Sequence, residues 1–284
     1  MEHIFPRNLT APTPKGIPFP EYYPYVMDYK FPVIMTSLYI IMVSLLNPKS
    51  NAVSRIVAKQ KGIKITNTKS NPLMTAFIFL HNLTLCAFSI ITFINMGSAF
   101  VMNFKNHSDS FTDAYCDRDS SLWNNALGYW GYFFYLSKVY EIVDTMIILF
   151  KGRRSSFLQT YHHAGAIITM WSGINSKAPP IWIFVVFNSF IHSIMYAYYA
   201  ATCIGLSPPG KQYLTTLQIT QFLIGTPLAI SYLFVNDCLR TDMAVYATYI
   251  NVAYLLPLTA LFINFAKNTY GRKKKIPKTV KKID

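Results

Sequence analysis

The chain has 284 residues, of which 52% are hydrophobic and 13% charged, and its formal net charge is +14. Soluble domains carry about 25% charged residues, so this composition excludes an ordinary water-soluble globular protein. Most basic residues lie in segments that separate apolar stretches. Membrane topology and anionic lipid therefore account for the positive charge, and no nucleic-acid partner is expected.

Long apolar runs follow one another along the chain. Residues 70–104, 178–210, 212–236 and 243–266 contain no Asp, Glu, Lys or Arg, and a helix needs about 20 such residues to cross a bilayer. Helices are predicted because no run alternates as barrel strands do. The predicted spans are Phe31–Leu46, Pro72–Met96, Ala126–Phe150, Phe157–Gly173, Ile181–Cys203, Leu214–Phe234 and Ala244–Phe265. We therefore expect an all-α, polytopic membrane protein with seven transmembrane helices.

Charges in the connecting segments orient these spans. The loops after the first and third spans and the tail 267–284 are basic, whereas the loops after the second and sixth spans carry mainly Asp. By the positive-inside rule, the basic segments are cytosolic. We expect one domain over 1–284, with a lumenal segment 1–30, a seven-helix core 31–266 and a cytosolic tail 267–284.

The tail ends in Lys281-Lys282-Ile283-Asp284, which resembles the dilysine signal that returns membrane proteins to the endoplasmic reticulum. A basic tail that ends in two lysines by chance is the alternative. Asn8 and Asn106 lie in Asn-x-Ser/Thr sequences on the lumenal side, so both are expected glycosylation acceptors. These features predict a multi-pass protein of the endoplasmic reticulum membrane with a cytosolic C-terminus.

Two cysteines, Cys116 and Cys238, fall in the predicted lumenal loops, where disulfides persist. We hypothesise that they form a disulfide that ties the entry of the third span to the connection between the sixth and seventh. Two free lumenal thiols are the alternative.

Ionisable side chains occur inside the third predicted span. Lys138, Glu141 and Thr145 recur at helical spacing and share one face, with Asp144 beside them. A charge in hydrocarbon costs about 2.5–3.5 kcal/mol on insertion scales, so such groups normally face a bundle interior or a wet cavity. Lys138 and Glu141 can neutralise each other. An ion pair that merely joins helices is the structural alternative.

Three more spans carry polar groups. Gln159 precedes His162 and His163 in the fourth span. Adjacent residues on a helix point about 100° apart, so one histidine can face a reactant while the other supports it or binds elsewhere. The stripes on the fifth and sixth spans are Asn188, His192, Met195, Tyr196 and Tyr199, and Thr215, Gln218 and Gln221. Tyrosine and methionine could be core packing, but burying asparagine and histidine on the same stripe costs free energy if they only fill space. The pattern predicts one polar chamber.

A metal centre is a further interpretation of the histidines. The chain has six histidines, and too few lie in the spans for a membrane di-iron site. A single zinc ion held by His162, His163 and His192 is geometrically conceivable, with one position left open. We expect no metal and no cofactor.

The four polar clusters resemble the motifs of the ELO family of fatty-acid elongases: K-x-x-E-x-x-D-T, H-x-x-H-H, H-x-x-M-Y-x-Y-Y and T-x-x-Q-x-x-Q. They stand here, in the family's order and spacing, as Lys138–Thr145, Gln159–His163, His192–Tyr199 and Thr215–Gln221. The resemblance extends from the first span to the tail. Gln159 replaces the first histidine of its motif, a form that resembles a subset of fungal and protist members, many acting on polyunsaturated chains.

The resemblance implies a seven-helix membrane domain that encloses an acyl-chain tunnel. It implies a 3-ketoacyl-CoA synthase that condenses acyl-CoA with the co-substrate malonyl-CoA, loses CO2 and lengthens the chain by two carbons. Expected partners, beside membrane lipid, are the 3-ketoacyl-CoA reductase, 3-hydroxyacyl-CoA dehydratase and enoyl-CoA reductase of the elongation cycle. Acyl-chain preference and the existence of a homo-oligomer stay open.

The residues permit a mechanism for this reaction. A neutral imidazole in an apolar tunnel can attack a thioester, so His162 is assigned as the nucleophile, with His163 beside it. His192 handles the proton or stabilises the enolate, and Glu141 or Asp144 orients an imidazole. Direct attack without an acyl-enzyme, with His162 as base, is the alternative.

The remaining motif residues are assigned to substrate binding. Hydrogen-bond donors to a carbonyl or thioester oxygen are expected at Gln159, Asn188 and Gln218. The chamber wall is expected at Lys138, Thr145, Met195, Tyr196, Tyr199 and Gln221, and the CoA phosphates at Lys151, Arg153 and Arg154. A transporter or receptor for a lipid-like ligand is the runner-up. A transporter usually shows matching broken helices in its two halves, and no such pair is found here.

Overall fold

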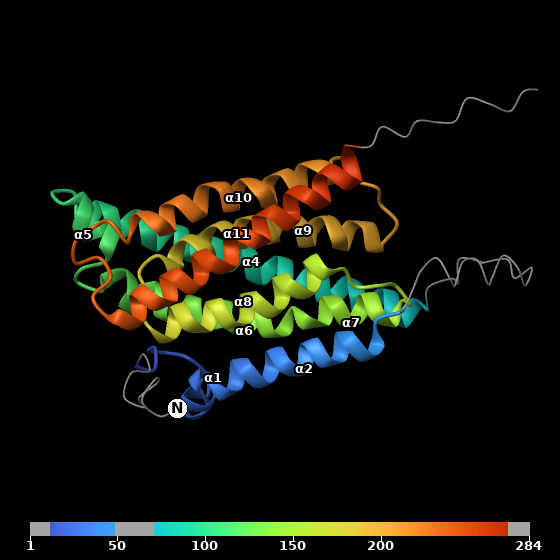
Figure 1. The fold of residues 1–284 in the computed structure, drawn as a ribbon, viewed down its shortest axis with the longest axis horizontal. Coiled ribbons are helices and arrows are strands. Elements are labelled where there is room, and N and C mark those ends of the chain that lie inside the picture. Colours follow the sequence, from blue (N-terminus) through green and yellow to red (C-terminus); the bar gives the residue numbers. More distant parts are fainter. Residues whose placement is uncertain (1–11, 49–70, 272–284) are drawn as a thin grey trace, which may run out of the picture.

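The computed structural model describes residues 12–48 and 71–271 (Figure 1). The candidate sites Asn8, Lys281 and Lys282 lie outside the described residues. Within the described ranges the chain forms helices and no strand. The helices are η2 (Pro20–Tyr22), α1 (Tyr23–Met27), α2 (Lys30–Leu46), α4 (Pro72–Asn106), α5 (Phe111–Cys116), η3 (Trp123–Leu127), α6 (Gly128–Tyr140), α7 (Ile142–Phe150), α8 (Phe157–Asn175), α9 (Ile181–Cys203), α10 (Lys211–Ser231) and α11 (Asp242–Tyr270).

Each of the seven predicted apolar stretches falls on helix, and the third is divided. α6 ends at Tyr140 and α7 begins at Ile142, with Glu141 between them. The amide of Asp144 bonds to the carbonyl of Glu141 at 3.0 Å, a three-residue bond that tightens the chain at this point. The predicted continuous helix over Ala126–Phe150 therefore has a break at one of its charged residues.

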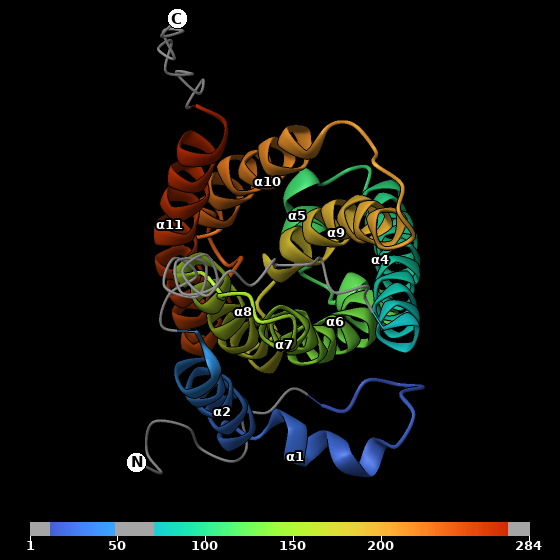
Figure 2. The same ribbon diagram turned by 90° about the vertical axis from the view of Figure 1, so that its right-hand side faces the viewer.

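Six helical segments close into a ring (Figure 2). Following the contacts around it, α4 packs on α9, α9 on α10, α10 on α11, α11 on α8, α8 on α6, and α6 returns to α4. α7 continues the course of α6. The first polar cluster spans the end of α6 and the start of α7, and the other three lie on α8, α9 and α10, so the ring brings all four around one interior.

Helix α2 lies outside this ring, against α8 and α7. Its Tyr39 hydroxyl lies 3.0 Å from the Thr145 hydroxyl. Just beyond its end, the Asn47 amide bonds to both backbone groups of Ser155, at 3.1 and 3.0 Å. At its other end, the Trp171 indole donates to the Met27 carbonyl at 2.9 Å. These bonds attach α1 and α2 to the ring along its length.

Among the described residues, three helices are long and apolar enough to cross a bilayer: α4, α9 and α11, with mean hydropathies of 2.0, 1.5 and 1.5. The segments Pro20–Met27 and Lys30–Leu46, bent by 66°, make a fourth if they are taken together. Large apolar side chains such as Leu73, Leu80 and Leu38 are exposed on the outer surface. A soluble protein rarely exposes extended apolar surface of this kind. The chain is a membrane protein.

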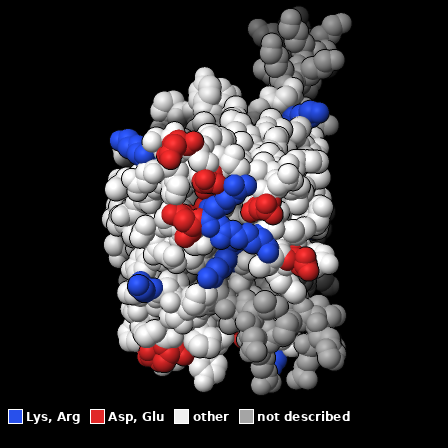
Figure 3. Space-filling view, turned by 90° about the vertical axis from the view of Figure 1, so that its left-hand side faces the viewer, with Lys and Arg blue, Asp and Glu red and all other residues white. Residues whose placement is uncertain are grey.

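One end of the ring is closed by a disulfide between Cys116 and Cys238, and we call it the disulfide end. Acidic and basic side chains gather on its surface (Figure 3). The Asp117 carboxylate accepts the amides of Leu122 and Trp123 at 2.8 and 2.9 Å, which fixes the entry to η3. Burial raises the pKa of Asp117. Asn106, the last residue of α4, is exposed near this end.

Candidate active site

A large cavity lies inside the ring, with about 1650 Å³ of empty space including the part open to solvent. It reaches the end opposite the disulfide, where Lys151 and Lys211 line it; we call this the basic end. The motif residues in its wall are Glu141, Asp144, Gln159, His162, His163, His192, Met195, Tyr196, Tyr199, Thr215, Gln218 and Gln221. Most of the predicted site thus surrounds one space. Arg153 and Arg154 are exposed and do not line it.

A buried ion pair lies beside this cavity. The Lys138 ammonium donates to Oε1 of Glu141 at 2.7 Å and to Oδ1 of Asn188 at 2.8 Å. It also lies 4.1 Å from the ring centroid of Phe134. The same Glu141 oxygen is 3.4 Å from Nδ1 of His192. The carboxylate therefore connects α6 to α9 and holds the ring of His192. Its other oxygen is buried without a partner among the described residues.

His162 occupies a different environment. The Ser156 hydroxyl accepts the amide of Gln159 at 3.1 Å and caps α8, which places His162 on the second turn. Its ring nitrogens have no hydrogen-bond partner among the described side chains, while its carbonyl accepts the Tyr254 hydroxyl at 2.8 Å. Tyr254 packs over Gly165, where a Cβ atom would lie 2.1 Å from the tyrosine ring. The imidazole is thus held by its backbone and remains free to meet a ligand.

His163 has different hydrogen-bond partners from His162, although both line the polar cavity. The two rings are 5.1 Å apart at 83°. Nε2 of His163 lies 3.1 Å from the Gln159 amide nitrogen, which also donates to Thr145 at 3.4 Å. The Thr145 hydroxyl in turn contacts Tyr39 of α2. With its amide hydrogens directed to Thr145 and His163, Gln159 supports His163 in this structure instead of offering a donor to the cavity.

Asp144 is held by a residue that the sequence analysis did not assign to the site. Nε2 of His81, on α4, lies 2.8 Å from Oδ1 of Asp144, and the Tyr196 hydroxyl donates to Oδ2 at 2.7 Å. Nδ1 of His81 lies 3.1 Å from the Tyr140 hydroxyl. Asp144 therefore orients His81, whereas Glu141 is the carboxylate beside His192. A histidine in a run without charges, 70–104, was the signal that could have drawn attention to it.

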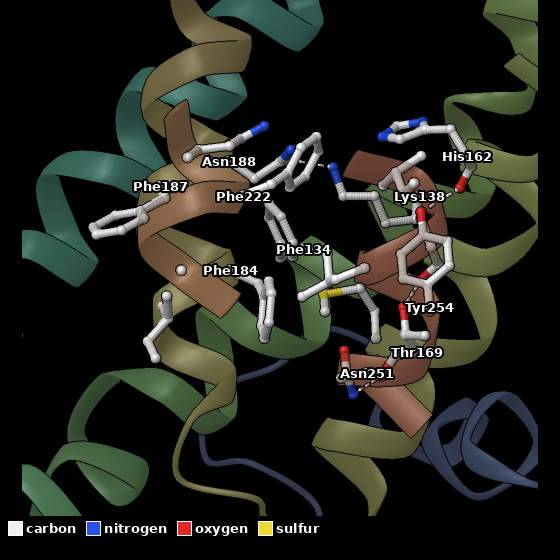
Figure 4. Close-up of a pocket in the computed structure, with 17 residues that line it drawn as sticks. Phe134, Lys138, His162, Thr169, Phe184, Phe187, Asn188, Phe222, Asn251 and Tyr254 are labelled. Carbon is white, nitrogen blue, oxygen red and sulfur yellow. Dashed lines mark hydrogen bonds between the residues drawn. The ribbon is translucent and has the colours of Figure 1, made fainter. Parts of the chain in front are cut away.

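A second pocket of about 540 Å³, including open space, lies beside the first, and His162, Gln221 and Phe222 line both. Its wall is mainly apolar, with Phe134, Phe184 and Phe187 among the lining residues (Figure 4). His162 and Lys138 lie at one end of this pocket, and Thr169 and Asn251 at the other. It extends from His162 toward the disulfide end, because its α9 residues lie in the first half of that helix.

The remaining predicted substrate-binding residues have different surroundings. The Gln218 amide donates to the sulfur of Met195 at 3.4 Å, and Oε1 of Gln221 is buried without a partner among the described residues. Asn188 lines the apolar pocket, not the polar cavity. Across the described ranges no three His, Cys, Asp or Glu side chains are grouped to hold a metal ion. The sequence analysis also missed Lys211 and Tyr254, which no motif marks.

Known proteins resemble this chain over the part that contains both cavities. The chain matches the ELO (GNS1/SUR4) family over residues 24–278. It is 26% identical to the fatty acid elongase sre1 of Dictyostelium discoideum over 257 residues, 88% of this chain and 89% of that protein. It is 29% identical to fatty acid elongase A of the same organism, over 71% and 74% of the two chains. It is 32% identical to the human very long chain fatty acid elongase 3 over 55% of this chain and 58% of that protein. The family match spans every residue of both cavities, and the chain belongs to the ELO (GNS1/SUR4) family.

Proposed function

We propose that this protein is a fatty-acid elongase that acts as a 3-oxoacyl-CoA synthase, an acyltransferase. It condenses a long-chain acyl-CoA with malonyl-CoA and releases CO2 and CoA. Family membership and the elongase relatives support elongation. The chemistry proposed for the site rests on one observation: His162 lies where the polar cavity meets the apolar pocket, and its imidazole has no described hydrogen-bond partner.

This junction suits a substrate with two unlike ends. The apolar pocket beyond His162 takes the acyl chain, whose burial contributes about 25 cal/mol per Å². The polar cavity takes the thioester and the pantetheine arm. At its basic end, Lys151 and Lys211 are placed to attract the CoA phosphates, with the exposed Arg153 and Arg154 just outside. The acyl thioester then lies against His162.

The first half-reaction transfers the acyl group to the enzyme. A ring nitrogen of His162 attacks the thioester carbonyl carbon, an N–C bond forms, and the C–S bond breaks. The departing CoA thiolate takes up a proton from water, and the acylated imidazole carries the positive charge until the enolate attacks. The Tyr254–carbonyl bond and the absence of a Cβ at Gly165 keep this part of α8 in place.

The second half-reaction uses malonyl-CoA. Its C–C bond to the carboxylate breaks, CO2 leaves, and the electron pair remains as an enolate. The enolate carbon attacks the acyl carbon on His162, the N–C bond breaks, and 3-oxoacyl-CoA is released. His192, held by Glu141 at 3.4 Å, is assigned to stabilise the enolate oxygen. In the alternative without an acyl-enzyme, His162 acts as a base and the enolate attacks acyl-CoA directly.

The wider setting is part of the proposal. All seven helical stretches cross the membrane of the endoplasmic reticulum, the basic end and the C-terminus face the cytosol, and the two cavities form one acyl tunnel. Cytosolic delivery of both CoA substrates agrees with cations at that end. Lys281 and Lys282 serve as the signal for retrieval to the endoplasmic reticulum. Polyunsaturated acyl chains are the preferred substrate class. Separate reductases and a dehydratase complete the elongation cycle.

The test is a reaction with purified protein in detergent, supplied with acyl-CoA and malonyl-CoA labelled in its free carboxyl carbon. We expect labelled CO2 and a 3-oxoacyl-CoA two carbons longer, in equal amounts. Release of neither, across acyl-CoAs of graded length and unsaturation, would contradict the proposal. The same series identifies the preferred chain.

A further inference from the structure

His81 is an unusual residue for its position. It lies inside α4, in a run of the chain without Asp, Glu, Lys or Arg, and its side chain is 1% exposed. It does not line either cavity. A buried polar side chain in a membrane helix is costly unless its partners satisfy it. The role of His81 is therefore to be found in the groups it contacts.

With Asp144 ionised and His81 neutral, the hydrogen bonds around His81 have one consistent set of donors and acceptors. Both oxygens of an ionised Asp144 can only accept, so Nε2 of His81 and the Tyr196 hydroxyl are the donors, at 2.8 and 2.7 Å. A neutral imidazole then accepts the Tyr140 hydroxyl at Nδ1, 3.1 Å away. Each ring nitrogen and each carboxylate oxygen is paired. The arrangement is complete without a ligand.

Tyr196 connects the Asp144–His81 pair to His192 in the proposed reaction centre. It follows His192 by one turn of α9, and the two rings meet edge to face at 5.3 Å and 81°. Its hydroxyl is fixed by Asp144, and its ring is also edge-on to His81 at 6.5 Å and 87°. Tyr196 is 1% exposed and packs in a small cluster with Leu85 of α4. The hydroxyl bond and the two ring contacts restrain its orientation.

His192 is thus restrained on two sides. Glu141 lies 3.4 Å from Nδ1, and the ring of Tyr196 supports the imidazole from the next turn. Nε2 is left as the ring nitrogen for the cavity that His192 lines. A reacting group must be held within a fraction of an ångström for full activity.

We propose that His81 is a positioning residue for the condensation. Through Asp144 and Tyr196 it fixes the imidazole of His192, without touching substrate itself. This inference rests on the proposed function. It assigns a role to α4, a helix in which the sequence motifs place no functional residue.

Two single variants and their double variant test the chain of contacts. His81→Leu keeps volume and removes the bond to Asp144, and Tyr196→Phe keeps the ring and removes the hydroxyl. His81 does not line the cavity, and Tyr196→Phe keeps the ring that does. We therefore expect each to lower kcat by about tenfold or more while KM for acyl-CoA changes by less than about twofold. Since both variants break the same connection, the double variant should lose no more than about twofold beyond the worse single variant.

Conservative rescue separates positioning from packing. His81→Gln retains a donor at the place of Nε2 and should recover most of the rate lost in His81→Leu. Met96→Ala is the matched control, because Met96 is equally buried on α4 but far along the helix from His81. It should lower the thermal midpoint and leave kcat within about twofold.

The outcomes are distinct. If wild-type protein releases no CO2 from malonyl-CoA, the proposed function fails. If wild-type protein is active and the losses in the double variant multiply, or His81→Gln is as slow as His81→Leu, the positioning role is overturned. If His81→Leu does not fold, Tyr196→Phe decides alone: a wild-type kcat in that variant overturns the role, and a reduced kcat with unchanged KM supports it.

Discussion

Removing the positive charge from the buried ion pair at the end of α6 should destabilise the protein strongly. The side chains of Lys138 and Glu141 are 4% and 2% exposed. In Lys138→Met the carboxylate would stay buried without its cation, and Asn188 would lose a donor. Breaking a buried pair by removing one partner costs about 3–5 kcal/mol. At about 2 °C per kcal/mol for a chain of this size, the thermal midpoint should fall by about 6–10 °C.

A second variant separates stability from activity. In Lys138→Met with Glu141→Gln, both charges are gone, and replacement of a whole buried pair is often close to neutral. At least half of the lost thermal stability should return. Activity should not, because a neutral amide beside His192 no longer favours charge on its imidazole. The expected result is a protein that is close to wild type in stability and impaired in CO2 release.

The assay is thermal unfolding in detergent, followed by CO2 release from malonyl-CoA on the same preparations. Lys105→Met is the control, since Lys105 is exposed in the last turn of α4 and its loss should shift stability by less than about 0.5 kcal/mol. A wild-type midpoint in Lys138→Met would refute the buried pair. A double variant less stable than either single variant would refute the reasoning about compensation.

Three further changes test other parts of the structure. Gly165→Ala would force the ring of Tyr254 from its site and disturb α8 at His162, so we expect a loss of about 1–3 kcal/mol and a clear fall in CO2 release; wild-type behaviour in both assays would refute that contact. Changing Cys116 and Cys238 together to Ser should lower the free energy of unfolding by about 2–5 kcal/mol with little effect on kcat, since the disulfide lies at the end opposite the basic end. Equal thermal midpoints with and without the disulfide would count against this stabilisation. In sealed microsomes a C-terminal tag should be digested from outside, and a protected tag would reverse the proposed orientation.

The helices could largely be predicted from the sequence, because hydropathy is a local property. α9 begins and ends at the predicted residues, Ile181 and Cys203, and α4 begins at Pro72 as predicted. The break at Glu141 could not be predicted in this way. The carboxylate of Glu141 meets both Lys138 and His192, and His192 lies on another helix whose position hydropathy does not give.

The sequence predicts those parts of the candidate site whose residues recur at helical spacing. The stripes on α8, α9 and α10 predict one chamber, and the structure places all of their residues except Asn188 around one cavity. Pairings between helices were not open to prediction. The two carboxylates are close in sequence, and nothing in their spacing tells that Asp144 meets His81, 63 residues earlier, while Glu141 meets His192. Such partners depend on how the ring closes.

In the proposed reaction, His162 is the reacting group, at the junction of the apolar pocket and the polar cavity. The direct measurement is the mass of the enzyme after exposure to acyl-CoA alone, together with the CoA released. We expect one CoA per site and one acyl group on the peptide that contains His162. Both should be absent from His162→Ala, which should also form no product. Loss of product in that variant without an acyl-enzyme in wild type would assign His162 as the base. Full condensation by the His162→Ala enzyme would show that His162 is not the reacting group.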